Sequence, residues 1–171
     1  MILSDKDIRR LLKSGKMEIS PMEESQIGPA SIDLTLSDEW QFFKKALKKK
    51  PVDLSKVPFQ EAFEKRKAAS ISLRPGQMCL ATTREKIRLP ANVMGNLEGR
   101  SRYARMGLVI HITSALVQPG SNNHQVLEIV NLAPFTIKLH AGMRISQVVF
   151  QQLKTATGKP YAVYGEIAKK Q

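Results

Sequence analysis

The residues best suited to chemistry lie in the stretch GRSRYARMG, at positions 99–107. It holds three arginines and a serine, with a glycine at each end: Arg100, Ser101, Arg102 and Arg105. Guanidinium groups bind oxyanions in a bidentate manner, and glycines let backbone N–H groups come close to an anion. The stretch therefore fits a polyphosphate cradle. The alternative is that its arginines only pair with carboxylates of the fold or of a subunit interface.

A second candidate is Glu128, which stands between Leu127 and Ile129 in VLEIVN. Alternate residues of a half-buried strand face opposite sides, so Glu128 is expected to face away from its apolar neighbours. Two interpretations stay open. The carboxylate simply faces solvent, or it is a general base whose pKa is adjusted by partial burial.

The sequence offers little for a metal site. Cys79 is the only cysteine, and the three histidines, His111, His124 and His140, show no close ligand spacing. Zinc-dependent deaminases need H-x-E followed by P-C-x-x-C, which a single cysteine cannot supply. We therefore expect no zinc, and we expect Cys79, inside QMCLAT, to be a core residue.

The bulk composition describes the molecule that must position these residues. The chain has 171 residues, of which 42% are hydrophobic and 25% charged, as in an ordinary globular domain. No apolar run approaches the roughly 18 residues of a membrane span, and no signal peptide is recognisable, so a cytoplasmic location is expected. The net charge of +12 favours an anionic partner.

The pattern of the chain predicts one mainly β domain over residues 1–171. A short helix is expected after Ser4, which suits an N-cap, and before Gly15, which suits a stop. Short strands with turn residues between them indicate a sandwich or barrel. They are expected at SIDLTL, LVIHITSALV, HQVLEIVNL and ISQVVFQQL. There is no P-loop and no G-x-G-x-x-G.

Two segments differ from this pattern. Residues 44–70 are Lys-rich and broken by Pro51 and Pro58, and they are weakly helical at FQEAFEKRKAA. They are too short to bury a core of their own and are interpreted as a surface insertion. Residues 154–171 form a polar tail, interpreted as a mobile arm.

Several motifs, taken in order, resemble the dCTP deaminases, members of the superfamily that includes the dUTP pyrophosphatases. The matching stretches are MILSDKDIRRLLKSGKMEISP, QIGPASIDLTL, LATTREKIRLPANVMGNLEGRSRYARMGL, LEIVN and HAGMRISQVVF. The resemblance implies a dUTPase-like distorted β-barrel or jelly roll with a short N-terminal helix. It also implies a homotrimer with active sites between subunits, and zinc-independent deamination of dCTP to dUTP and ammonia.

The resemblance assigns roles to the chemical residues. Glu128 is expected to activate the water that attacks C4 of cytosine, and Ser101 and Arg105 to position that water and the glutamate. Arg105 would keep Glu128 ionised. Magnesium is expected to arrive with the triphosphate.

Further residues would bind the substrate. The resemblance implies phosphate contacts from Arg100 and Gln147, and recognition of the base edge around Thr113 and Ser114. Tyr161 matches a tyrosine of the family's tail. Arg102 replaces a commoner serine and is expected to add a phosphate contact.

One stretch departs from the family. Where the family has I-D-P-G followed by an aromatic residue and a glycine, this chain has VQPGSNN, with Gln118, Ser121 and Asn123 at those positions. Gln118 lies in the region that packs around the deoxyribose, and it replaces the aspartate that activates water in dUTP pyrophosphatases. It therefore counts against pyrophosphatase activity.

Two other functions stay open. One is a bifunctional enzyme that continues to dUMP, and the other is a non-catalytic nucleotide-binding relative. The partners expected are dCTP and dUTP, with neither a membrane nor nucleic acid.

Overall fold

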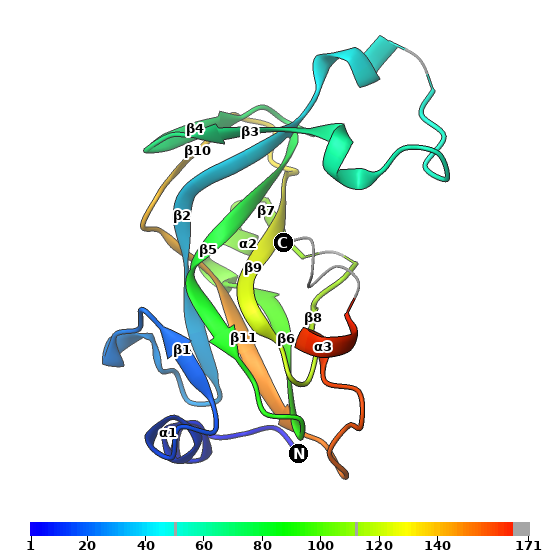
Figure 1. Ribbon diagram of the computed structural model, residues 1–171. Coiled ribbons are helices and arrows are strands. Elements are labelled where there is room, and N and C mark those ends of the chain that lie inside the picture. Colours follow the sequence, from blue (N-terminus) through cyan, green and yellow to red (C-terminus); the bar gives the residue numbers. More distant parts are fainter. Residues whose placement is uncertain (50, 112, 166–171) are drawn as a thin grey trace.

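A computed structural model describes residues 1–49, 51–111 and 113–165. The chain is mainly antiparallel β-strands in a sheet that curls into a half barrel, with short helices at its margins (Figure 1). The helices are α1 (Asp5–Lys13), α2 (Ser101–Ala104) and α3 (Tyr161–Tyr164), and the 3-10 turns are η1 (Glu24–Gln26), η2 (Lys45–Lys49) and η3 (Phe59–Ala62). The strands are β1 (Glu18–Ser20), β2 (Ser31–Phe43), β3 (Phe63–Lys67), β4 (Ser70–Leu73), β5 (Met78–Arg88), β6 (Val93–Gly99), β7 (Leu108–Ile110), β8 (Leu116–Val117), β9 (Asn122–Asn131), β10 (Ile137–His140) and β11 (Arg144–Gln152).

The main sheet runs in the order β7-β9-β5-β2-β11-β6-β8, with β1 added to β5 and β3 added to β2. A separate ribbon pairs β10 with β4. Strands far apart in sequence are therefore neighbours, and the predicted mainly β class is confirmed.

The N-terminal helix begins as predicted. The Asp7 backbone N–H donates to Ser4 Oγ, and the Asp7 carboxylate accepts from the Ser4 N–H, which closes a capping box. Ile8 is fully buried against the sheet. Gly15 follows the helix with a φ of 68°, a conformation that glycine adopts at low cost.

Irregularities bend the two longest strands. The register between β2 and β5 shifts between Leu36 and Trp40, and that between β5 and β9 shifts between Thr82 and Lys86. Glu85, in the β5 irregularity, is buried, and its carboxylate accepts hydrogen bonds from Gln26 Nε2 at 2.9 Å and from the Thr35 N–H at 2.8 Å. These bends curl the sheet around its core.

The Lys-rich insertion projects from one end of the sheet (Figure 1). The weak helix expected at FQEAFEKRKAA is wrong, because the chain makes only the turn η3 and then the strand β3. β3 pairs with β2, with Phe63 opposite Phe43 and Lys65 opposite Gln41. Pairing with the end of β2, Glu39–Phe43, which extends past β11, outweighs a weak local helical propensity.

The single strand expected at LVIHITSALV is also wrong. The stretch forms β7 and β8, which lie at opposite ends of the strand order. The chain leaves β7 at His111, whose φ of 52° is incompatible with a continuing strand.

Two observations concern the outside of the fold. No helix within the described ranges is long and apolar enough to cross a membrane. The tail follows the sheet surface by backbone hydrogen bonds, from Leu153 to Asn92, from Thr157 to Ala91 and from Tyr161 to Pro119. Residues 166–171 of the tail lie outside the described residues.

Candidate active site

Glu128 lies in the middle of β9, on the face turned away from the core. Its neighbours Leu127 and Ile129 are fully buried, whereas the Glu128 side chain is 30% exposed. Strand alternation thus places this carboxylate as predicted. Leu80 of β5 stands directly opposite it in the register, so one side of the carboxylate is apolar and the other reaches solvent.

His111 is the nearest ionisable partner of Glu128. Its Nδ1 lies 3.6 Å from Glu128 Oε2, and its backbone N–H donates to the Glu128 carbonyl. The imidazole is only 4% exposed, and neither ring nitrogen has a hydrogen-bond partner among the described residues. A buried polar group without a partner is costly, and so is a left-handed backbone in a residue other than glycine.

Burial lowers the pKa of His111 below its ordinary value of 6.5, and the nearby Glu128 carboxylate opposes that shift. The ring is therefore neutral at neutral pH and carries one N–H. The Nδ1 atom, at 3.6 Å, lies just beyond hydrogen-bonding distance of the carboxylate. The pair offers a partly exposed carboxylate, a candidate base, beside a neutral imidazole.

Sequence reasoning missed His111 in this role. The sequence presents His111 only as a candidate metal ligand, because its place beside Glu128 results from a contact between β7 and β9. Pairing between strands is not visible in one sequence. The only local signal is that a histidine interrupts a strong β pattern.

Arg100 and Gln147 are brought together at the junction of β6, β11 and β2. Arg100 Nη2 lies 3.1 Å from Asp33 Oδ2, and Nη1 donates to the Arg144 carbonyl at 3.0 Å. Gln147 accepts from Ser31 Oγ at 2.8 Å. The predicted phosphate ligands are thus held in place, and Arg100 is already paired with a carboxylate.

Asp33 is the half-buried partner of this arginine. Burial raises the pKa of the Asp33 carboxyl, while the positive charges of Arg100 and Arg144 oppose the shift. The side chain is 17% exposed, compared with 38% for Arg100. An anionic ligand at Arg100 would have to share the guanidinium with Asp33.

Ser101, Arg102 and Arg105 lie on or next to α2, and all three are exposed. The Arg102 guanidinium carbon lies 5.8 Å from the centre of the Tyr103 ring. Within the described part of the chain, no side-chain hydrogen bond or ion pair joins Ser101 or Arg105 to Glu128. One chain therefore does not assemble the catalytic set that the sequence predicts.

Gln118 and Tyr161 lie in the region where the tail crosses the loop before β9. The Tyr161 N–H donates to the Pro119 carbonyl, and the Ser121 hydroxyl donates to the Gln118 carbonyl at 2.7 Å. Gly120 has a φ of 76°, and a Cβ there would lie 2.6 Å from the Cβ of Pro160. Only glycine lets the tail seat this closely.

The remaining predicted residues are placed as follows. Thr113 and Ser114 are exposed and come shortly after His111, with residue 112 outside the described residues. Cys79 is fully buried, and burial raises the pKa of its thiol to about 12, as expected of a core cysteine. Within the described residues, no group of three or more His, Cys, Asp or Glu side chains is arranged to hold a metal ion.

Comparisons with known proteins agree on one family. A family model described as dCTP deaminase-like matches residues 2–153. The chain is 36% identical over 169 residues to a dUMP-forming dCTP deaminase of Methanosphaera stadtmanae, covering 94% of this chain and 83% of that protein. It is 37% identical over 166 residues to a dCTP deaminase of Natronomonas pharaonis, covering 94% and 85%.

Solved structures agree on the fold. A dCTP deaminase from Agrobacterium tumefaciens superposes with a TM-score of 0.67 at 21% identity, over 88% of this chain and 47% of that one. The chain thus spans about half the length of that structure. A Staphylococcus bacteriophage 80alpha dUTPase superposes with a TM-score of 0.53 at 14% identity, over 82% of this chain and 85% of that one. The dUTPase-like fold predicted from the sequence is confirmed.

Proposed function

The chain belongs to the dCTP deaminase-like family and is a hydrolase that deaminates dCTP, and from that premise we propose that Glu128 is its general base. The observation that carries this proposal is the position of the carboxylate. It is partly exposed on the outer face of β9, and a neutral buried imidazole lies 3.6 Å away. It has solvent on one side, and no Lys or Arg side chain of the described part of the chain forms an ion pair with it.

The reaction needs one group that moves protons. Glu128 takes a proton from water as the water oxygen adds to C4 of cytosine, and it passes that proton to N3. Glu128 then takes the proton of the C4 hydroxyl and gives it to the amine, which leaves as ammonia as the C4–N bond breaks and the C4 carbonyl forms. A single carboxylate within hydrogen-bond reach can carry both protons. His111, whose Nδ1 lies 3.6 Å from Glu128 Oε2, is placed to orient the carboxylate for this shuttle.

The site is completed by a second copy of the chain, in a homotrimer. Ser101 and Arg105 are exposed and do not touch Glu128 within one chain. Three exposed apolar side chains, Met106, Leu132 and Phe135, lie at 55%, 65% and 48% exposure next to α2, where the Leu132 N–H donates to the Gly107 carbonyl. Such a patch favours burial in a subunit contact. In that assembly the Arg105 guanidinium of a neighbouring copy would face Glu128 and keep the carboxylate ionised.

The substrate's other parts are assigned to the remaining residues. Arg100, Arg102 and Gln147 bind phosphates, and the backbone around Thr113 and Ser114 reads the base edge. Gln118 and Tyr161 lie beside the sugar.

Magnesium is carried by the triphosphate oxygens, which are ligands that this hard cation prefers. It needs no cluster of protein ligands, and the steps above do not pass through it.

The product is dUTP. Support comes from Gln118, whose neutral amide cannot take a proton from water, as the aspartate at this position does in dUTP pyrophosphatases. The competing product is dUMP, which the names of several relatives favour, including those from Methanosphaera stadtmanae and Methanobrevibacter smithii.

One incubation separates the two products. Purified protein is supplied with dCTP and Mg²⁺, and ammonia, pyrophosphate and the nucleotide products are followed together. Ammonia with dUTP and no pyrophosphate supports the proposal. Pyrophosphate released in step with ammonia establishes the dUMP-forming reaction, and no ammonia at all contradicts the deaminase function.

A further inference from the structure

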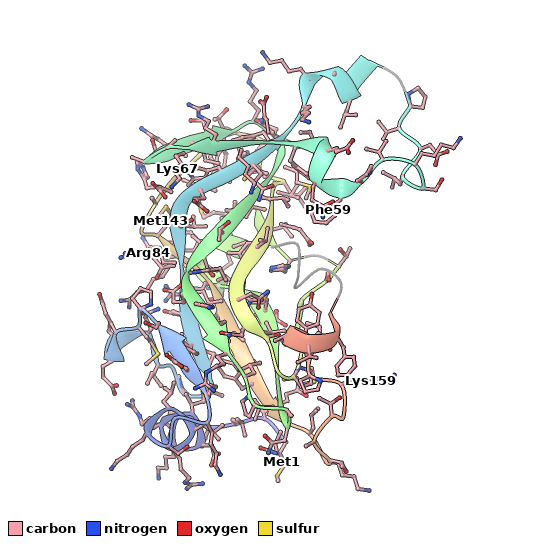
Figure 2. The ribbon with its side chains drawn as sticks, in the orientation of Figure 1. Met1, Phe59, Lys67, Arg84, Met143 and Lys159 are labelled. Carbon is pink, nitrogen blue, oxygen red and sulfur yellow. The ribbon has the colours of Figure 1, made fainter. Side chains whose placement is uncertain are left out.

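A groove of about 660 Å³ lies between the Lys-rich insertion and the outer face of the sheet. One wall comes from η3, β3 and β2, and the other from β5 and β9. Figure 2 shows Phe59 where the insertion returns toward the sheet, and Lys67 at the far end of β3. The volume is typical of a site for a small organic ligand.

The strand register connects this groove to Glu128. Lys65 stands opposite Gln41, Gln41 opposite Leu80, and Leu80 opposite Glu128. Residues directly opposite each other share a face of the sheet, so Glu128 lies beside Leu80 on the face that forms the floor of the groove. Three strand spacings put Lys65 about 14 Å from Glu128 across the sheet.

A second lysine reaches the groove from the other direction. Lys86 pairs with His124, which lies four residues before Glu128 on β9. Four residues along β9 and one strand spacing across to β5 put Lys86 about 14 Å from Glu128 as well. Both lysines thus lie at a distance comparable with that between the base of a nucleotide and its terminal phosphate.

The charges of the groove are not neutralised. Lys67 pairs with Glu39 at 3.3 Å, but the Lys65 and Lys86 ammonium groups have no ion pair or hydrogen bond within the described ranges. The insertion at 44–70 carries nine Lys and Arg residues against three Asp and Glu, a net charge of +6 out of the +12 of the chain. Such a concentration of positive charge favours an anionic ligand.

The groove also has an apolar part. Phe59 is 47% exposed at its mouth, and the Phe63 ring stacks on Phe43 with centroids 4.5 Å apart. Leu80 and Val126 form the floor beside Glu128. The groove is apolar near the Glu128 carboxylate, and its ammonium groups lie farther away. This order matches a nucleotide whose sugar lies toward Glu128 and whose phosphates point away from it.

We propose that this groove is part of the substrate site, and that Lys65 and Lys86 bind phosphates of the nucleotide whose base lies at Glu128. These contacts come from the same chain as Glu128 and add to those assigned to Arg100 and Gln147. The inference rests on the proposed function, and it gives the Lys-rich insertion a role in choosing triphosphates over less phosphorylated substrates.

The test is the double substitution Lys65→Gln with Lys86→Gln in the full chain. Lys138→Gln is the matched control, because Lys138 is an exposed lysine on β10 that does not line the groove. Ammonia release gives kcat and KM for dCTP and for dCMP. Loss of charge-assisted phosphate contacts raises the KM for dCTP about tenfold or more, with a smaller rise for dCMP and kcat within about twofold.

Other outcomes decide against the groove. A dCTP-to-dCMP KM ratio equal to that of the control overturns the proposal, and so does a change in the assembled mass of the double variant, which would make the insertion a subunit contact. If wild type releases no ammonia, equilibrium binding of dCTP separates the two ideas. Binding that the double substitution abolishes supports the groove while the deaminase function fails, and binding that survives the substitution overturns the groove.

Discussion

Restoration of activity by mixing two inactive variants tests whether the active site is shared between chains. Glu128→Gln removes the proposed base, and Arg105→Ala removes the cation proposed to face it. Each variant alone is expected to be inactive. When equal amounts are unfolded and refolded together, a site is complete only where a chain with Glu128 meets a neighbour with Arg105. In a closed ring of randomly mixed chains, about one quarter of the sites meet this condition.

Ammonia release from dCTP is the assay, with each variant refolded alone as the baseline. The mixture is expected to recover about one quarter of the wild-type rate per site. The number follows from the geometry, because one described chain makes no contact between Arg105 and Glu128. A mixture that stays at the baseline although mixed trimers have formed, as native mass measurement can show, would mean that both residues act within one chain.

Three further substitutions test separate parts of the fold. Gly120→Ala adds a Cβ 2.6 Å from the Cβ of Pro160, at a residue with a left-handed backbone. The substitution should detach the tail and speed its cleavage by trypsin. The control Gly158→Ala, whose Cβ would have no atom within 4 Å, should not. Glu85→Gln sets an amide N–H against one of two buried donors; urea unfolding should show a loss of about 1–3 kcal/mol, and an unchanged midpoint would contradict the buried network. Burial lowers the pKa of His111 below 6.5 in the folded chain. As the pH falls below 6.5, the unfolded chain therefore binds a proton at this histidine before the folded chain does. The free energy of unfolding, which is at its full value above pH 6.5, decreases in that range. His111→Leu should flatten this part of the Tm profile, and an equally steep profile in the variant would refute the assignment.

The fold was largely readable from local pattern. Alternation predicted β9 and the outward position of Glu128, and the Ser4 cap marked the start of α1. The local pattern gave wrong elements where pairing between distant segments determines the secondary structure. β2 continues to Phe43 because an irregularity after Leu36 resets its alternation. β3 exists because the edge of β2 needs a partner.

The site was readable only in part, for the same reason. The motifs identified the candidate residues of α2 and β9, but they do not show whether these residues meet within one chain. The contact of His111 with Glu128 depends on β7 lying beside β9. The groove depends on a row of residues from β3, β2, β5 and β9. A single sequence holds no record of which strands are neighbours.

Ammonia release from dCTP by Glu128→Gln, together with dCTP binding by the same variant, tests the central claim most directly. Glu18→Gln is a suitable control, since it removes an exposed glutamate of β1 whose partner is Arg88. Glutamine keeps the shape of the side chain but cannot take a proton from water. The account predicts that kcat falls by at least about 10²-fold, while the dissociation constant for dCTP changes by less than about threefold, or about 0.7 kcal/mol. A Glu128→Gln variant that deaminates dCTP within tenfold of wild type would contradict it.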